Sequence, residues 1–135
     1  MAIRMELSRI FIREMTDLQF IELREADGER SFPIAIGLPE AQAIERRLKG
    51  IQPQRPQTHD LLAQVIEAFG AAVERVTITD LDENTFFAKI TIRGPGERMM
   101  DIDSRPSDAI ALGSAIGIPI YVEESVLEQA ATEGA

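Results

Sequence analysis

The stretch that decides the fold class spans residues 86–116 and reads FFAKITIRGPGERMMDIDSRPSDAIALGSAI. Residues 86–93 alternate apolar and polar side chains with a period of two, which predicts a strand with one buried face. A Gly-Pro-Gly turn at 94–96 leads into a second strand over 99–103, and the small residues of 106–116 predict a closely packed helix. Two consecutive strands followed by a helix favour a mixed sheet with helices over a doubly wound nucleotide fold.

The rest of the chain adds strands and helices on both sides of this stretch. Asp27-Gly28 supplies a hairpin turn, and Pro33 cannot donate to a ladder, so an edge or a bulge is expected there. Thr58 is the predicted N-cap of the second helix. Strands are predicted over 5–13, 18–25, 30–37, 73–79 and 119–122, helices over 39–50 and 58–70, and an acidic helix or frayed tail over 123–131. The prediction is an α/β (α+β) fold with a mixed sheet of about six to seven strands and three main helices.

Length and composition are those of one globular domain. The chain has 135 residues, 44% of them hydrophobic and 27% charged, which predicts a single domain over 1–135 with a core of about 5–128 and an acidic tail over 129–135. The absence of cysteine excludes a disulfide scaffold, a thiolate zinc site and a cysteine nucleophile. The apolar runs are too short to span a membrane and the first residues do not resemble a secretory signal, so a cytoplasmic location is expected.

The net charge argues against nucleic acid as a partner. Fourteen Lys and Arg residues face 23 Asp and Glu residues, which gives −9 at pH 7. Proteins that bind nucleic acid usually carry a basic footprint that neutralises phosphates. Any phosphate contact here must therefore come from a local basic patch, a metal ion, or an assembly that gathers arginine side chains.

Two segments of the chain echo each other: Arg55-Pro56-Gln57-Thr58-His59-Asp60 and Arg105-Pro106-Ser107-Asp108. In each, Arg-Pro leads through a hydroxyl residue to an Asp at the start of a predicted helix. The unpaired N–H groups of a helix N-terminus and the planar fork of an arginine suit a phosphate or a carboxylate. Stability explains the same residues, because Ser or Thr caps a helix and Asp suits its first turn. Both interpretations stay open.

Further candidates for chemistry are one histidine and several carboxylates. His59 is the only histidine, and its ordinary pKa near neutrality suits proton transfer, although a helix-start histidine is often merely hydrogen-bonded. Asp101 and Asp103 point the same way on their predicted strand. With Asp108, Asp103 would form an oxygen-rich site for Mg²⁺ or Mn²⁺, the alternative being a solvated strand edge and a helix cap. Glu40 is either a carboxylate of the same cleft or an acid that suits the helix dipole.

Three motifs, in order, resemble the signatures of the bifunctional nuclease domain family. They are Phe32 to Gly37 with Glu40-Ala41, Arg55 to Leu62, and Asp103 to Leu112. The resemblance covers about residues 5–128 and implies an α/β fold with a mixed sheet, self-association into a homodimer or a larger homo-oligomer, and activity on RNA and DNA. Ala35 departs from the pattern, since a large aromatic is common there, which would enlarge a pocket or weaken an interface. Ser104 stands where Ala is common.

Two functional hypotheses follow. The first is a nuclease whose residues the resemblance carries over position by position. Its catalytic residues would be His59, Asp60, Asp103 and Asp108, its substrate-binding residues Arg55, Thr58, Arg105 and Ser107, and its metal ligands Asp103 and Asp108, with Glu40 as a further candidate. The second is a non-catalytic module that uses the same polar cleft to bind a small anion, a nucleotide or a partner protein, which the −9 charge favours. A basic cleft would support the nuclease, and arginines buried in Asp pairs would support a structural role.

Overall fold

The computed structural model describes residues 1–13 and 15–131, which form one α+β domain. The strands are β1 (Ala2–Phe11), β2 (Gln19–Glu25), β3 (Ser31–Ile36), β4 (Ala72–Asp82), β5 (Thr85–Arg93), β6 (Met99–Ser104) and β7 (Ile120–Glu123). The helices are α1 (Leu38–Leu48), α2 (Thr58–Ala68), α3 (Pro106–Ile116) and α4 (Glu124–Ala130), with a 3-10 turn over Pro95–Glu97.

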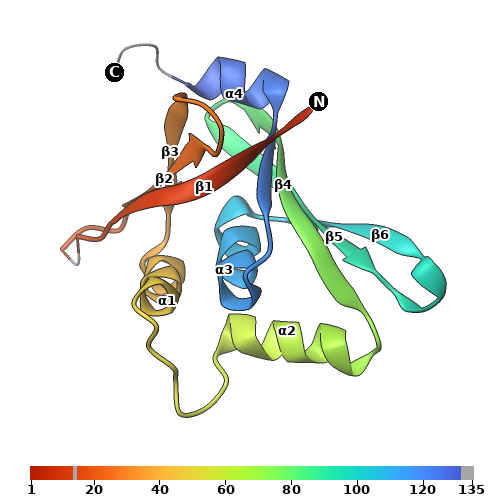
Figure 1. Ribbon diagram of the computed structural model, residues 1–135. Helices are drawn as coiled ribbons and strands as arrows, with labels where there is room; N and C mark the ends of the chain where they lie inside the picture. The colour runs from red at the N-terminus through yellow and green to blue at the C-terminus, as the bar shows by residue number, and fades with distance from the viewer. Residues whose placement is uncertain (14, 132–135) are drawn as a thin grey trace.

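The seven strands form a single mixed sheet in the order β3-β2-β1-β7-β4-β5-β6 (Figure 1). β7, the last strand along the chain, lies between β1 and β4. It pairs antiparallel with β1, from Ala2↔Glu123 to Met5↔Ile120, and parallel with β4. All other neighbouring strands are antiparallel. The predicted mixed sheet is therefore confirmed.

Tight turns close the hairpins of this sheet. Glu83 and Asn84 join β4 to β5 with φ angles of 47° and 66°, the left-handed conformation that a two-residue hairpin loop requires. The predicted hairpin at Asp27-Gly28 also forms, between β2 and β3. Pro33 lies on β3, which is an edge strand, so its missing N–H leaves no ladder bond in the sheet interior unmade.

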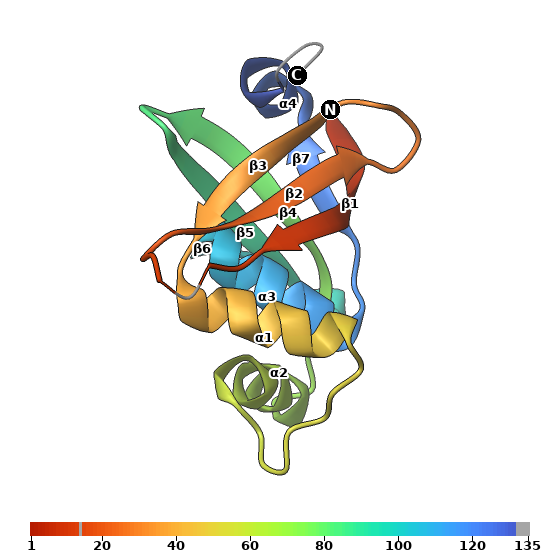
Figure 2. The ribbon, with the colours of Figure 1, turned by 90° about the vertical axis from the view of Figure 1, so that its left-hand side faces the viewer.

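The helices cover one end of the sheet in two layers, with α1 and α3 against the strands and α2 beneath them (Figure 2). α3 buries most of its length, including Ile110 and Leu112, which are fully inaccessible. α1 buries Ala41 and Ile44. α2 has no buried residue, although Ala63 and Ile66 pack against the core in part. The elements that carry the echoed segments therefore differ greatly in how firmly they are held.

Most predicted elements form, with differences at their ends. β1 starts at Ala2 rather than residue 5, because its first residues pair with β7, a contact that local periodicity does not reveal. The predicted N-cap of α2 is wrong by one residue, since Gln57 and not Thr58 occupies it. The end of the chain forms a fourth helix, α4, and residues 132–135 of the predicted tail lie outside the described residues. No helix in the described part of the chain is long and apolar enough to cross a membrane.

Candidate functional site

The N-terminus of α2 is a capping box that engages Asp60. The Asp60 Oδ2 atom accepts the backbone N–H of Gln57 at 3.0 Å, and the Gln57 side chain accepts the backbone N–H of Asp60 in return. Arg47, at the end of α1, also donates to Asp60. Burial raises the pKa of the Asp60 carboxyl, but the hydrogen bonds from Gln57 and Arg47 lower it more, so that its pKa lies below the ordinary value. Asp60 thus secures the start of α2.

The N-terminus of α3 is built differently although its sequence echoes that of α2. Arg105 is the N-cap and Pro106 the first helical residue, so Asp108 holds the third helical position, as Asp60 does in α2. No side chain caps α3. Asp108 is therefore free to point outward, where its Oδ2 atom accepts from Arg105 Nε at 3.0 Å. Arg55 is not the counterpart of Arg105, because it lies two residues before the N-cap of α2.

Arg105 joins the N-termini of α1 and α3. Its Nη2 donates to the Oε1 atom of Glu40 at 3.0 Å, across 65 residues of sequence. Glu40 occupies the third position of α1, after the N-cap Gly37, and its side chain is only 11% exposed. A Cβ at Gly37 would lie 3.2 Å from Glu40 Oε2, so the glycine leaves room for the carboxylate. The Arg105 side chain remains 68% exposed, and hydrogen bonding to Asp108 and Glu40 raises its pKa.

His59 links α2 to the side chains of Asp108 and Arg105. Its Nε2 atom lies 3.1 Å from Asp108 Oδ1, and its side chain is 15% exposed. Burial raises the pKa of the Asp108 carboxyl, but hydrogen bonds from His59 and Arg105 lower it more, so Asp108 is ionised at neutral pH. An ionised carboxylate only accepts hydrogen bonds, so His59 Nε2 is the donor of this pair and Nδ1 is the ring nitrogen that does not contact Asp108. His59, Asp108, Arg105 and Glu40 form one connected group from three helices.

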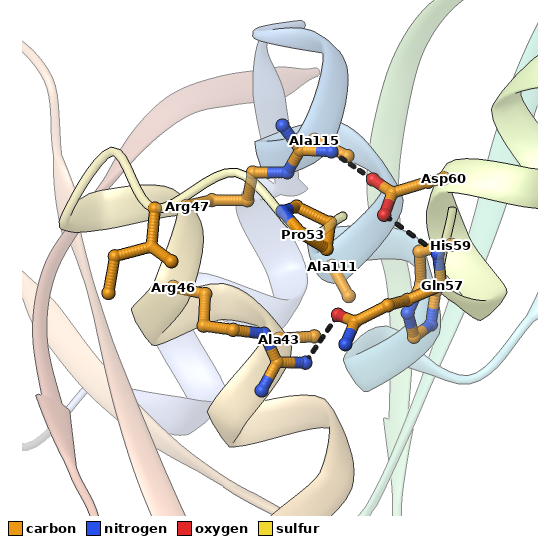
Figure 3. Close-up of a pocket in the computed structure, with 10 residues that line it drawn as sticks. Ala43, Arg46, Arg47, Pro53, Gln57, His59, Asp60, Ala111 and Ala115 are labelled. Carbon is orange, nitrogen blue, oxygen red and sulfur yellow. Dashed lines mark hydrogen bonds and ion pairs between the residues drawn. The ribbon is translucent and has the colours of Figure 1, made fainter. Parts of the chain in front are cut away.

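This group borders an open hollow of about 840 Å³ between the starts of the three helices. α1 contributes Gln42, Ala43 and Arg46 to its wall, and α2 contributes Thr58 and His59. Arg46 donates to the Gln57 side chain at 2.6 Å. Figure 3 draws a neighbouring pocket and shows Arg46 and Arg47 reaching from α1 toward Gln57 and Asp60. Within the hollow, the positive charges of Arg46 and Arg105 balance the negative charges of Glu40 and Asp108.

The remaining predicted site residues lie in different places. Thr58 lines the hollow, and Ser107 is buried beside Arg105 in the wall of an adjacent one. Arg55 is exposed and has no ion pair with the described residues. Asp103 is the cross-strand partner of Lys89, one position along from the Ile90↔Ile102 pair. Asp103 also lines a third hollow together with His59 and Asp108, so it borders the same group of residues.

A divalent ion does not fit the side chains as they lie. No three His, Asp or Glu residues within 1–13 and 15–131 are grouped so that they could hold a metal. Glu40 and Asp108 already accept hydrogen bonds from Arg105, and Asp103, although it lines a hollow with Asp108, completes no such group. The Mg²⁺ or Mn²⁺ expected from the sequence therefore stays a prediction, and we assign no catalytic step to it.

The sequence predictions missed three polar residues that shape the site. Arg46 and Arg47 lie in the last turn of α1, and Gln57 follows the proline-rich connector. Basic residues in a last turn usually match the helix dipole, which hides their other contacts. Only the close approach of the end of α1 to the start of α2 shows that they reach Gln57 and Asp60.

The fold and this group of residues define the class of protein. It is an α+β domain with a histidine–carboxylate pair and an arginine at the meeting point of three helix N-termini. A family model described as the bifunctional nuclease domain matches residues 21–134. The chain belongs to this family, as the sequence motifs predicted.

Similar proteins from two kingdoms match most of the chain. The uncharacterized protein Rv1829 of Mycobacterium tuberculosis is 46% identical over 108 residues, which cover 80% of this chain and 63% of that protein. Bifunctional nuclease 1 of Oryza sativa subsp. japonica is 25% identical over 118 residues, covering 85% of this chain and 36% of the plant protein. A bifunctional nuclease of Oryza minuta matches to the same extent. The chain thus spans less than two thirds of the length of these relatives.

Proposed function

We propose that this domain hydrolyses phosphodiester bonds in RNA and DNA. One observation carries the proposal: His59, Asp108, Arg105 and Glu40, far apart in sequence, meet at the edge of an open hollow. A base, a carboxylate that orients it and an exposed guanidinium are the groups that phosphodiester hydrolysis uses. Membership in a nuclease family supports the same assignment.

In the proposed reaction, His59 acts as the base. Nδ1 takes a proton from a water molecule, and the water oxygen bonds to phosphorus as the bond to the leaving sugar oxygen breaks. His59 then returns the proton to that sugar oxygen. Asp108 holds the ring and stabilises its protonated form. The Arg105 Nη1 group makes no hydrogen bond within the described residues, so it is free to donate to a phosphoryl oxygen.

The experiment compares purified wild type with His59→Ala and Asp108→Asn on single-stranded RNA and DNA. Each change should lower cleavage by at least about 10²-fold, because the base or its orientation is lost. Asp82→Asn, at an exposed aspartate at the end of β4 that lines neither hollow beside His59, is the matched control and should cleave like wild type. Equal residual cleavage in wild type and both variants would indicate a contaminating nuclease and rule the proposal out. Parallel assays with EDTA, then with added Mg²⁺ or Mn²⁺, test the predicted metal.

A second candidate function is a non-catalytic module for a small anion, a nucleotide or a partner protein. The observation that favours it is the pairing of Arg105 with two carboxylates in a chain of net charge −9. Calorimetric binding of a nucleotide by wild type, with no cleavage that His59→Ala removes, would select this function. Cleavage that depends on His59 would select the nuclease.

A further inference from the structure

A second hollow, of about 500 Å³, opens on the other side of Arg105. One wall is the outer face of the β2–β3 hairpin and the residue before it, with Leu18, Phe20, Pro33 and Ala35. The β4–β5 turn and the start of α3 form the rest. Apart from Arg105, the proposed catalytic group uses none of the residues that line this hollow.

The wall of this second hollow is apolar but open to solvent. Leu18 is 59% exposed and Phe20 41% exposed, so neither is held in the core. An aromatic face that is open at the mouth of a hollow suits stacking with a planar ring. A volume of this size, mainly apolar walls and a few polar groups at one end are typical of sites for small organic groups.

Arg105 connects the apolar hollow to the polar one, because it is a lining residue of both. A phosphate bound at Arg105 beside His59 would therefore leave its attached nucleoside next to the apolar wall. Ala35, the cross-strand partner of Phe20, keeps the space above the ring open, since it ends at Cβ. The two hollows match the two halves of a nucleotide, one charged and one planar and apolar.

We infer that the hollow lined by Phe20 and Ala35 binds a nucleobase of single-stranded RNA or DNA whose phosphate lies at Arg105. This inference rests on the proposed nuclease function. A single strand is required because the face of a base in a duplex is already stacked on its neighbours.

The test compares the binding affinities of two unlabelled oligomers of equal length and equal charge. One is a short oligothymidylate, and the other is an oligomer of abasic tetrahydrofuran sites. Both are measured with His59→Ala protein, so that neither is cleaved. Because their phosphates are the same, repulsion from the −9 charge affects both alike and the comparison isolates the base. The base-containing strand should bind at least about fivefold more tightly.

Two variants in the His59→Ala background locate this preference. Phe20→Ala removes the stacking surface, and Ala35→Trp fills the hollow; both should reduce the preference to about onefold. Phe87→Ala is the matched control, because Phe87 is 43% exposed but does not line the hollow, and it should keep the preference. Thermal melts check folding. If Ala35→Trp does not fold, Phe20→Ala decides, since its ring lies on the surface.

The outcomes separate this inference from the proposed function. Equal binding of both strands, or a preference that survives Phe20→Ala, overturns the base-binding hollow even if cleavage depends on His59. If the preference for the base-containing strand depends on Phe20 but the wild-type protein cleaves neither RNA nor DNA, the base-binding hollow is supported and the proposed catalysis is ruled out.

Discussion

Three acidic residues occupy the same position in their helices but make different contacts. Glu40, Asp60 and Asp108 are each the third residue of their helix. Asp60 accepts the backbone N–H of its own N-cap residue, whereas Glu40 and Asp108 accept from the side chain of Arg105. The sequence predicted that acids would open these helices, because that follows from the local pattern. It could not predict which carboxylate joins His59, because that depends on how the helices pack.

Asp60→Asn should separate stability from catalysis. The amide keeps an oxygen for the capping box but loses the charge that faces Arg47, so the free energy of unfolding should fall by roughly 1–2 kcal/mol. Cleavage per folded molecule should stay within a few-fold of wild type, since Asp60 makes no hydrogen bond to Asp108, the carboxylate that pairs with His59. Chemical denaturation and a cleavage assay check the two parts. A loss of activity as large as that of Asp108→Asn would place Asp60 in the catalytic group instead.

The same carboxylate predicts a pH dependence. The pKa of Asp60 is lower in the folded protein than its ordinary value of 3.8, so the unfolded chain binds more protons near that pH. Its stabilising contribution is complete above about pH 4 and is lost as the pH falls through the folded-state pKa. Denaturation curves between about pH 5 and pH 2 should therefore be less pH-dependent in Asp60→Asn than in wild type. Parallel curves for the two proteins would contradict this.

The individual strands and helices could be predicted from the sequence, but their arrangement in space could not. The alternation of β5 and the small residues of α3 are local patterns, and both elements formed where they were expected. The place of β7 between β1 and β4 is set by pairing across more than 100 residues, which no local pattern records. The place of Asp103 in the wall of a hollow with His59 and Asp108 likewise depends on the packing of α2 beside β6, which no local pattern records.

α2 should be the least protected of the three helices around the site. It has no buried residue, whereas α3 buries seven. Helices with few buried contacts open at a lower free energy than the core. Hydrogen exchange should therefore show faster exchange for amides of α2 than for those of α3. Equal protection would mean that α2 opens only with the whole domain.

The net charge of this domain determines how strongly its binding to a polyanion depends on salt. Among the described residues, Arg46 and Arg105 bring positive charge to the polar hollow, and the carboxylates of Glu40 and Asp108 balance them. About two phosphate contacts give a slope of log K against log salt of roughly −1.4 for a single strand. Binding titrations over a range of salt should show a slope no steeper than about −2. A steeper slope would reveal a basic surface beyond the hollow.

Self-association, which the family resemblance implied, stays a prediction with a defined surface. Leu61 and Val65 of α2 are exposed, as are Phe69 at the C-cap of α2 and Met100 and Ile102 of β6. Large exposed apolar side chains of this kind are typical of surfaces that bury each other. Sedimentation equilibrium should show association of wild type that Phe69→Lys weakens.

The control for this change is Phe87→Lys, which adds the same charge at an exposed phenylalanine of β5. It should associate like wild type. A wild-type protein that is monomeric at every concentration would contradict the prediction.

The central place of β7 also governs how this protein can be made in the cell. The β1–β2–β3 meander and the β4–β5–β6 meander touch in the sheet only through a strand near the end of the chain. During synthesis the β1–β2–β3 meander emerges from the ribosome long before β7, so β1 keeps an unpaired inner edge until residues 120–123 follow. Such edges readily pair with other chains, so we expect the nascent protein to be most prone to misassociation before β7 emerges.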